Sequence, residues 1–332
     1  MKFSQILTVV FVACLLVSAV PASAASQNYK LGVQSGTTSD TYAAENLPNA
    51  QVSGFDSIDL AIEALKQGDV DFVLGDLPTL KFYQADSEGL IIAGEFSEED
   101  FGIGVAPGES DLLAAINVAL GEIIDSGEYD TIFTDTFGDE IVVLTDDTDE
   151  STATEYPADA TGTLADALAA GNLVFGTDPY YPPFESYDTD NETVIGFDAD
   201  IAAAIGAKIA AAYDQNLSVT MHEKTWDDLL AFQYTDYDAT LSAMTKTAQR
   251  AEKTDFTRAY YSSKQGILAS ADSPTITGVD DLDGTYDDGV VEETNTTEET
   301  NEPAVVEDDS PSLALVVSAL TIGLIAVARR KH

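Results

Sequence analysis

The stretch from Ser242 to Arg250, with the sequence Ser-Ala-Met-Thr-Lys-Thr-Ala-Gln-Arg, gathers residues that can bind an anion. The whole chain has only 14 Lys and Arg against 59 Asp and Glu, yet this stretch contains Lys246 and Arg250, and Lys253 follows it closely. A hydroxylated turn offers main-chain N–H groups, and an arginine offers a planar guanidinium that binds a carboxylate in a bidentate manner. The stretch predicts a carboxylate site, although a solvated helical Arg250 is the alternative.

Further polar and aromatic side chains follow apolar segments that are predicted to be strands. Open α/β sheets place ligand-binding groups at the carboxyl ends of their strands, so these side chains are expected to lie near one another. They are Asp76 after 70–74, Asp178 and Tyr181 after 173–176, Trp226 after 217–221, and Thr245 after 239–241.

Strand and helix patterns alternate along the chain, which predicts an α/β fold. Helix 57–67 has Ile58, Ala61, Ile62 and Leu65 at helical spacing. The other predicted helices are 164–170, 198–212 and 227–233.

Two acidic, Thr-rich stretches without Lys or Arg divide the chain. Residues 139–161 are predicted to be a linker, and residues 285–311 an extended, self-repelling stalk. The linker separates two folded blocks, 28–138 and 162–284, and the stalk follows the second block.

Both ends of the chain indicate export. Residues 1–24 have Lys2, an apolar run and Ala22-Ser23-Ala24, which is typical of a signal peptide. Removing it would leave no cysteine, because Cys14 is the only one. Residues 312–332 are apolar and end in Arg329-Arg330-Lys331, which predicts a transmembrane anchor or a sorting tail. We therefore expect an extracytoplasmic protein that is held to the membrane by its C-terminal segment.

The composition argues against several functions. A net charge of −45 makes nucleic acid an unsuitable partner, because phosphate contacts need clustered Lys and Arg. His222 and His332 are the only histidines, so no His-rich metal site and no His-based catalytic triad is expected. No cofactor, metal or catalytic residue is predicted.

Ordered motifs give the chain a specific resemblance. They are Gly176-Thr177-Asp178 through Pro182-Pro183-Phe184-Glu185, Gly196-Phe197-Asp198, Met244-Thr245 through Arg250, Asp255-Phe256-Thr257, Gly32 through Thr38, and Asp71 through Asp76. With them the chain resembles the type 2 periplasmic (extracellular) solute-binding proteins, family 3, of polar amino-acid ABC transporters. The resemblance implies a two-lobed periplasmic-binding-protein-like type II fold.

The two lobes come in the reverse of the family's order. In the family, the phrase resembled by 273–284 leads directly into the one resembled by 29–38, and the closing phrase resembled by 125–138 stands at the end. The chain therefore reads as a circular permutant. The linker could extend to roughly 75 Å at about 3.3 Å per residue, so one chain could close on itself. A swapped dimer and a remnant of two tandem proteins are the alternatives.

The resemblance also implies roles for individual residues. Arg250 would pair with the ligand α-carboxylate, helped by Thr245 and by the main chain at Ala243 and Thr38. Asp76 would take the α-ammonium. Ala243 stands where many relatives have Gly, which weakens that one carry-over. The full set of expected ligand-binding residues is Arg250, Thr245, Ala243, Asp178, Tyr181, Trp226, Gln34, Thr38 and Asp76.

The expected function is capture of a polar amino acid between the lobes and its delivery to an ABC transporter permease. A few relatives of this fold are dehydratases that act on cyclic amino-acid precursors. The chain could therefore instead be a cyclohexadienyl- or arogenate-dehydratase-like enzyme that uses Glu185, although a structural role of Glu185 is favoured. A ligand-sensing surface protein without a transport role is the third reading.

Overall fold

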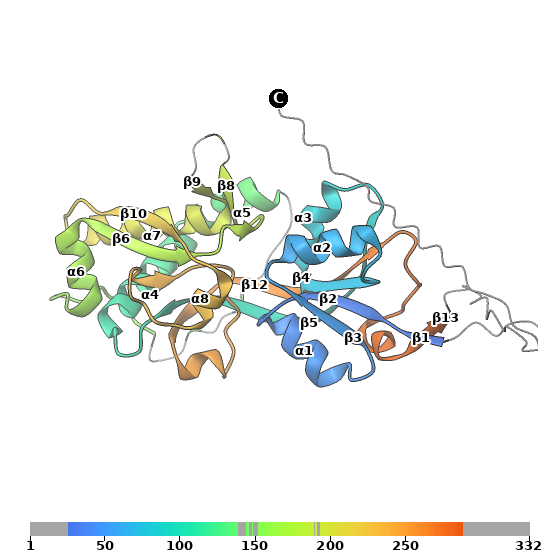
Figure 1. Cartoon of the computed structure of the whole chain (residues 1–332). Coiled ribbons are helices and arrows are strands. Elements are labelled where there is room, and N and C mark those ends of the chain that lie inside the picture. Colours follow the sequence, from blue (N-terminus) through green and yellow to red (C-terminus); the bar gives the residue numbers. More distant parts are fainter. Residues whose placement is uncertain are drawn as a thin grey trace, which may run out of the picture. The chain divides into compact units, whose positions relative to one another are not determined.

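The computed structural model describes residues 26–138, 144–145, 148, 152–188, 190 and 193–287. Within these residues the main element is an eight-stranded sheet (Figure 1). Its strands, in order across the sheet, are β10 (Ser218–Glu223), β6 (Asn172–Thr177), β11 (Ala239–Thr240), β5 (Leu90–Val105), β12 (Asp255–Ser270), β4 (Phe72–Asp76), β2 (Lys30–Gln34) and β3 (Gln51–Phe55). Three parallel strands lie at either end, and the antiparallel pair β5 and β12 joins the two ends.

Helices and a small second sheet surround these two ends, which we call lobe I (residues 101–262) and lobe II (residues 26–100 and 263–287). Lobe II contains α1 (Thr38–Asn46), α2 (Ile58–Gln67) and α3 (Leu77–Ala85). Lobe I contains α4 (Ser110–Asp125), α5 (Glu128–Phe137), α6 (Gly162–Ala170), α7 (Phe197–Ala212), α8 (Trp226–Leu230) and the small sheet β7 (Tyr180–Tyr181), β8 (Glu185–Asp188) and β9 (Thr193–Ile195).

Local sequence explains α2 and the strand that follows it. Ser57 is the N-cap and Gly68 ends the helix in the left-handed conformation that glycine adopts without strain. The apolar side chains at helical spacing are buried, while every residue of β4 is buried between neighbouring strands. Asp76 is therefore held in place as the last residue of a buried strand.

The strands β5 and β12 are 16 residues long each and are the paired segments that pass from one lobe to the other. Their pairing has register shifts between Phe256 and Ala259, and again between Lys264 and Gln265. Such irregularities bend a strand pair locally. The pair has the properties of a hinge between the lobes.

Aromatic rings fill the centre of lobe I. Phe184, Phe197 and Tyr261 are fully or almost fully buried and meet edge to face, with Phe133 and Phe137 packed beside them. Burying one such ring stabilises the fold by roughly 1.5–3 kcal/mol. Because α5 supplies two of these rings, residues 128–137 belong to the same core as residues 164–209.

The described part of the acidic linker contacts lobe I. Tyr156 packs against its core and donates a hydrogen bond to Glu122, and Leu144 also packs there. The Thr145 N–H donates to Ser262 Oγ at 2.9 Å. The linker therefore buries more than its composition predicts.

The described segment closes with its two ends together. Strand β1 (Ser26–Asn28) pairs antiparallel with β13 (Thr285–Asp287), and Tyr29 stacks on Tyr286 at 4.8 Å between ring centroids. None of the helices within these described ranges is long and apolar enough to cross a membrane. The expected signal peptide (1–24) and the expected anchor (312–332) lie outside the described residues.

Candidate functional site

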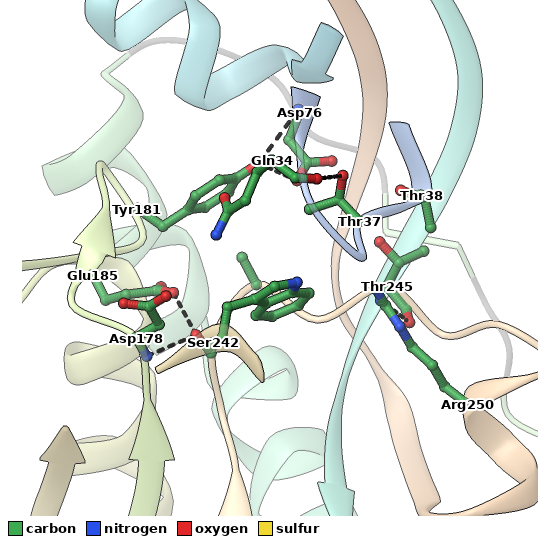
Figure 2. A pocket seen from close by; sticks show the side chains of 12 residues that line it. Gln34, Thr37, Thr38, Asp76, Asp178, Tyr181, Glu185, Ser242, Thr245 and Arg250 are labelled. Atoms are coloured by element: carbon green, nitrogen blue, oxygen red, sulfur yellow. Dashed lines mark hydrogen bonds between the residues drawn. The ribbon is translucent and has the colours of Figure 1, made fainter. Parts of the chain in front are cut away.

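A cavity lies between the lobes and contains about 350 Å³ of non-atom space, open solvent included. Figure 2 shows the side chains around it, with Asp178 and Arg250 at opposite ends of the group. The lining residues are Gln34, Thr37, Thr38, Asp76, Asp178, Tyr181, Glu185, Trp226, Ser242, Ala243, Thr245 and Arg250. All nine ligand-binding residues expected from the sequence are among them.

Arg250 forms one end of the cavity and is 8% exposed. Its Nη1 donates to the Thr245 carbonyl at 2.9 Å, and its Nη2 donates to the Gly36 carbonyl of lobe II at 3.3 Å. The guanidinium also lies 5.3 Å from the centre of the Trp226 ring. Burial lowers the pKa of Arg250, but an arginine stays charged in proteins, so a buried cation faces the cavity.

The turn beside Arg250 exposes main-chain groups. Phe101 and Thr245 lie opposite each other in an antiparallel bridge. The residues on either side of them make the hydrogen bonds of this bridge. The Thr245 N–H therefore points away from β5. Ala243 has φ of 42°, a backbone region that favours glycine. Gly36, with φ of 73°, could not carry a Cβ without meeting Leu230 at 2.7 Å. Leu230 of lobe I thus packs closely against the turn at Gly36 of lobe II.

Asp76 lies across the cavity, on lobe II, and is 8% exposed. The Tyr181 hydroxyl of lobe I donates to its Oδ2 at 2.6 Å, and Gln265 Nε2 donates to its Oδ1 at 2.6 Å. Burial and the nearby Glu99 raise the pKa of Asp76 to about 7. The carboxyl is therefore poised to lose a proton when a cation binds beside it.

Asp178, at the far end from Arg250, is anchored through its main chain. Its N–H donates to Ser242 Oγ at 3.0 Å, and Ser242 Oγ donates to Glu185 Oε1 at 2.7 Å. Burial, together with the nearby acids Glu223 and Asp59, raises the pKa of Asp178 to about 6. This end of the cavity is acidic.

Glu185 and Asp198 form a fully buried pair of acids below the cavity. Burial and the neighbouring acid hold the pKa of Glu185 well above its usual range, and burial raises that of Asp198 to about 7. Asp198 Oδ2 accepts the Ala243 N–H at 2.8 Å and the Tyr260 hydroxyl at 3.0 Å. The pair supports the turn at Ala243.

Three buried polar atoms of the lining have no hydrogen-bond partner within the described residues: Gln34 Oε1, Glu185 Oε2 and Trp226 Nε1. Buried polar groups are nearly always hydrogen-bonded, so an unpaired acceptor and an unpaired donor at one cavity point to a ligand or ordered water. Trp226, 9% exposed, also offers an apolar face beside Arg250.

The sequence did not indicate five residues of the site as ligand contacts. Thr37, Ser242 and Glu185 line the cavity. Glu99 and Gln265, on the hinge strands, hydrogen-bond to its lining residues. Gln265, just before the apolar segment 266–269, is the one sequence feature that could have drawn attention to the hinge.

Residues 173–322 match the family described as bacterial extracellular solute-binding proteins, family 3. ABC transporter arginine-binding protein 1 of Escherichia coli (strain K12) is 33% identical over 108 residues, which are 32% of this chain and 42% of that protein. This part of the chain is similar to the family 3 solute-binding proteins. A probable histidine-binding protein of Neisseria gonorrhoeae, 30% identical over 117 residues, covers 33% of this chain and 44% of its own length.

The match to family 3 is partial. The chain spans less than half of the length of these two curated relatives. The crystal structure of the ancestral amino acid-binding protein AncCDT-1, a precursor of cyclohexadienyl dehydratase, is 32% identical, with a TM-score of 0.25 over 28% of this chain and 38% of that chain.

Proposed function

We propose that this protein binds a polar amino acid in the cavity between its lobes. The observation that carries the proposal is the position of Arg250 and Asp76, a buried cation on lobe I and a buried acid on lobe II, at one cavity. An amino acid carries a carboxylate and an ammonium on one carbon, so both ends find an opposite charge. Only the arrangement in which the lobes meet lets both side chains hold the same ligand.

The remaining lining suits the body of such a ligand. Tyr181 and Trp226 supply apolar faces that exclude water from the charged contacts. The unpaired Gln34 Oε1 and Trp226 Nε1 supply an acceptor and a donor. Thr38 stands at the N-terminus of α1, where main-chain N–H groups favour an anion.

The single-chain permutant is part of the proposal. The sequence places the junction of the family's two phrases between Gly284 and Tyr29, and Thr285 pairs with Asn28 across β13 and β1. The family match begins at residue 173, in the middle of the chain. Both observations support a chain whose original ends are now joined by the linker and whose new ends meet in lobe II.

The proposal extends to location and partner. Family 3 is described as extracellular, and the predicted signal peptide (1–24), stalk (285–311) and tail (312–332) favour a tethered extracytoplasmic protein. An ABC transporter permease is the proposed recipient of the ligand, because the named relatives include an ABC transporter binding protein.

Binding without chemical change is favoured over dehydration. Glu185 lines the cavity and its raised pKa would suit a general acid, but its Oε1 accepts from Ser242 and its neighbour Asp198 holds the Ala243 turn. A supporting role accounts for both contacts.

Isothermal titration calorimetry with the twenty common amino acids tests the proposal. At least one polar amino acid should bind with one-to-one stoichiometry and should raise the melting temperature by mass action. Absence of binding by every amino acid would contradict it.

A further inference from the structure

Glu99, on hinge strand β5, is held by both lobes at the edge of the cavity. Its Oε2 accepts hydrogen bonds from Thr38 Oγ1 of lobe II at 2.9 Å and from Thr245 Oγ1 of lobe I at 2.8 Å. Gln265 Nε2 of β12 donates to the same oxygen at 3.0 Å. One carboxylate oxygen therefore joins both lobes and both hinge strands.

In these contacts, the threonine hydroxyls beside Arg250 donate their protons to Glu99. A threonine hydroxyl has one proton to donate, and both Thr38 and Thr245 donate theirs to Glu99. A ligand carboxylate next to Arg250 would then meet main-chain N–H groups and the guanidinium, with Glu99 as a negative neighbour.

The charges around the cavity have an excess of acid. Arg250 is the one cationic side chain among the described lining residues, which include the acids Asp76 and Asp178, whereas burial favours the uncharged form of the third acid, Glu185. Gln265 Nε2 donates to both Glu99 and Asp76, and the charge of Glu99 also acts on Arg250, so Glu99 lies close to the two groups that are proposed to hold the ligand ammonium and carboxylate. An amino acid's own carboxylate and ammonium cancel, which leaves this excess to act on its side chain.

Provided that the cavity binds an amino acid, we propose that Glu99 is a specificity-determining residue: its carboxylate makes the cavity prefer an amino acid with a cationic side chain and disfavour one with a second carboxylate. Like charges placed together at a binding site repel each other, and rejection of unwanted ligands commonly uses such repulsion. The three donors, on three different elements, keep Glu99 from turning away to relieve it.

The opposite end of the cavity fits the same ligand class. Asp178 lies there with Glu223 and Asp59 near enough to affect its ionisation. A cationic side chain that reaches Asp178 would neutralise part of this cluster, whereas an acidic one would add to it.

The test compares lysine, glutamine and glutamate, which are similar in length, by calorimetry. The wild type should bind them in the order lysine, glutamine, glutamate. In Glu99→Gln the preference for lysine over glutamate should fall at least tenfold, because the negative charge is removed while a hydrogen-bonding group of the same shape remains.

The matched control is Glu98→Gln, which makes the same charge change at the adjacent, exposed position of β5. This control should leave the ratio of lysine affinity to glutamate affinity within twofold of the wild-type ratio. Glu99→Asp, which keeps the charge, should retain most of the preference for lysine. A merely structural role of Glu99 would weaken all three ligands equally.

Two results would overturn the inference while the binding function stands: a wild type that prefers glutamate, or a Glu99→Gln variant that binds lysine and keeps the wild-type preference. The first needs no variant, so it applies even if Glu99→Gln does not fold. A wild type that binds no amino acid would instead remove the proposed function on which the inference rests.

Discussion

The hydroxyl of Tyr181 donates to the carboxylate of Asp76 at 2.6 Å, and this hydrogen bond joins the two lobes across the cavity. It stabilises the charged form of an acid whose pKa burial and Glu99 raise to about 7. The contact between the lobes and the ionisation of Asp76 are therefore coupled.

Ligand affinity should depend on pH because of Asp76. The ammonium of an amino acid binds the charged form of this acid, whose pKa in the free protein is about 7. Affinity should therefore rise as pH increases from 5 to 8 and level off above. Calorimetry at several pH values in buffers of different ionisation enthalpy would show proton release near pH 6–7, and a pH-independent affinity would contradict the assignment.

Tyr181→Phe should move this profile to higher pH. The substitution removes the hydrogen bond that lowers the pKa of Asp76, so more of the acid is protonated at neutral pH. Affinity should drop about tenfold at pH 7 and less at pH 8.5, since a lost hydrogen bond to a charged group is worth about 1.5–3 kcal/mol. Tyr180→Phe changes the adjacent, exposed tyrosine and should leave the profile in place.

Arg250→Ala should weaken amino-acid binding by about 2–5 kcal/mol, because it removes one partner of a buried charge pair. Lys253→Ala, an exposed cation close in sequence, is the control and should have little effect. Calorimetry with the ligand found for the wild type measures both. Unchanged affinity in Arg250→Ala would show that the ligand carboxylate lies elsewhere.

The stability of the free protein should decrease as pH rises from about 4 to about 7. Asp76, Asp178 and Asp198 have folded-state pKa values of about 7, 6 and 7, above the usual value near 4, so the folded state binds more protons over this range. Their contribution is complete below pH 4 and is lost through pH 7. Asp236 and Asp281 have lowered pKa values, but both are on the surface and their opposing effect is small.

Thermal unfolding should show this as a melting temperature that is lower at pH 7.5 than at pH 5 by roughly 5–10 °C, which corresponds to a few kcal/mol. Glu185→Gln, which replaces one acid of the buried pair by a neutral group, should reduce the difference. A melting temperature that rises over this interval would show that the buried acids are not protonated as assigned.

Incubation with amino acids and with arogenate should return them chemically unchanged, because Glu185 accepts a hydrogen bond from Ser242 and is proposed to have a supporting role. Mass spectrometry detects any product. Turnover by the wild type that disappears in Glu185→Gln would favour the dehydratase reading.

The positions of the expected site residues could be predicted because they depend on short segments. Asp76, Asp178 and Thr245 each follow a strand of the same sheet, and the strand ends converge on one cavity. Their roles in binding stay predictions. Glu99 could not be found in this way, since its place depends on the pairing of β5 with β12, in which Glu99 lies opposite Ser263, 164 positions away in the numbering.

Local patterns also gave some wrong boundaries. The helix predicted over 227–233 ends at Leu230, because Phe232 and Tyr234 have positive φ angles and pack with Trp226 in a small apolar cluster. Tertiary packing there overrides helix propensity. In the linker, Tyr156 finds a place on lobe I that composition alone did not indicate.

The last prediction concerns the order of the lobes. A chain that begins at Thr161, runs through Gly284 and a short connection into Tyr29, and ends at Gly138 would restore the family's order. Because Thr285 and Asn28 are paired neighbours in β13 and β1, a short connection should join these ends without moving either lobe. Circular permutation is tolerated when the ends lie close together at the surface.

The rearranged chain should therefore fold as a monomer and bind its ligand within about threefold of the wild-type affinity, which corresponds to roughly 0.6 kcal/mol. Cleavage of the wild-type linker at a protease site inserted near Ser151 should likewise leave two fragments that stay together, because α5 and α7 share one core and β5 pairs with β12 along most of its length. Light scattering and calorimetry measure both. Dissociation of the fragments, or a rearranged chain that binds only as a dimer, would contradict the single-chain permutant and favour the swapped dimer, in which the lobes of one cavity come from two chains.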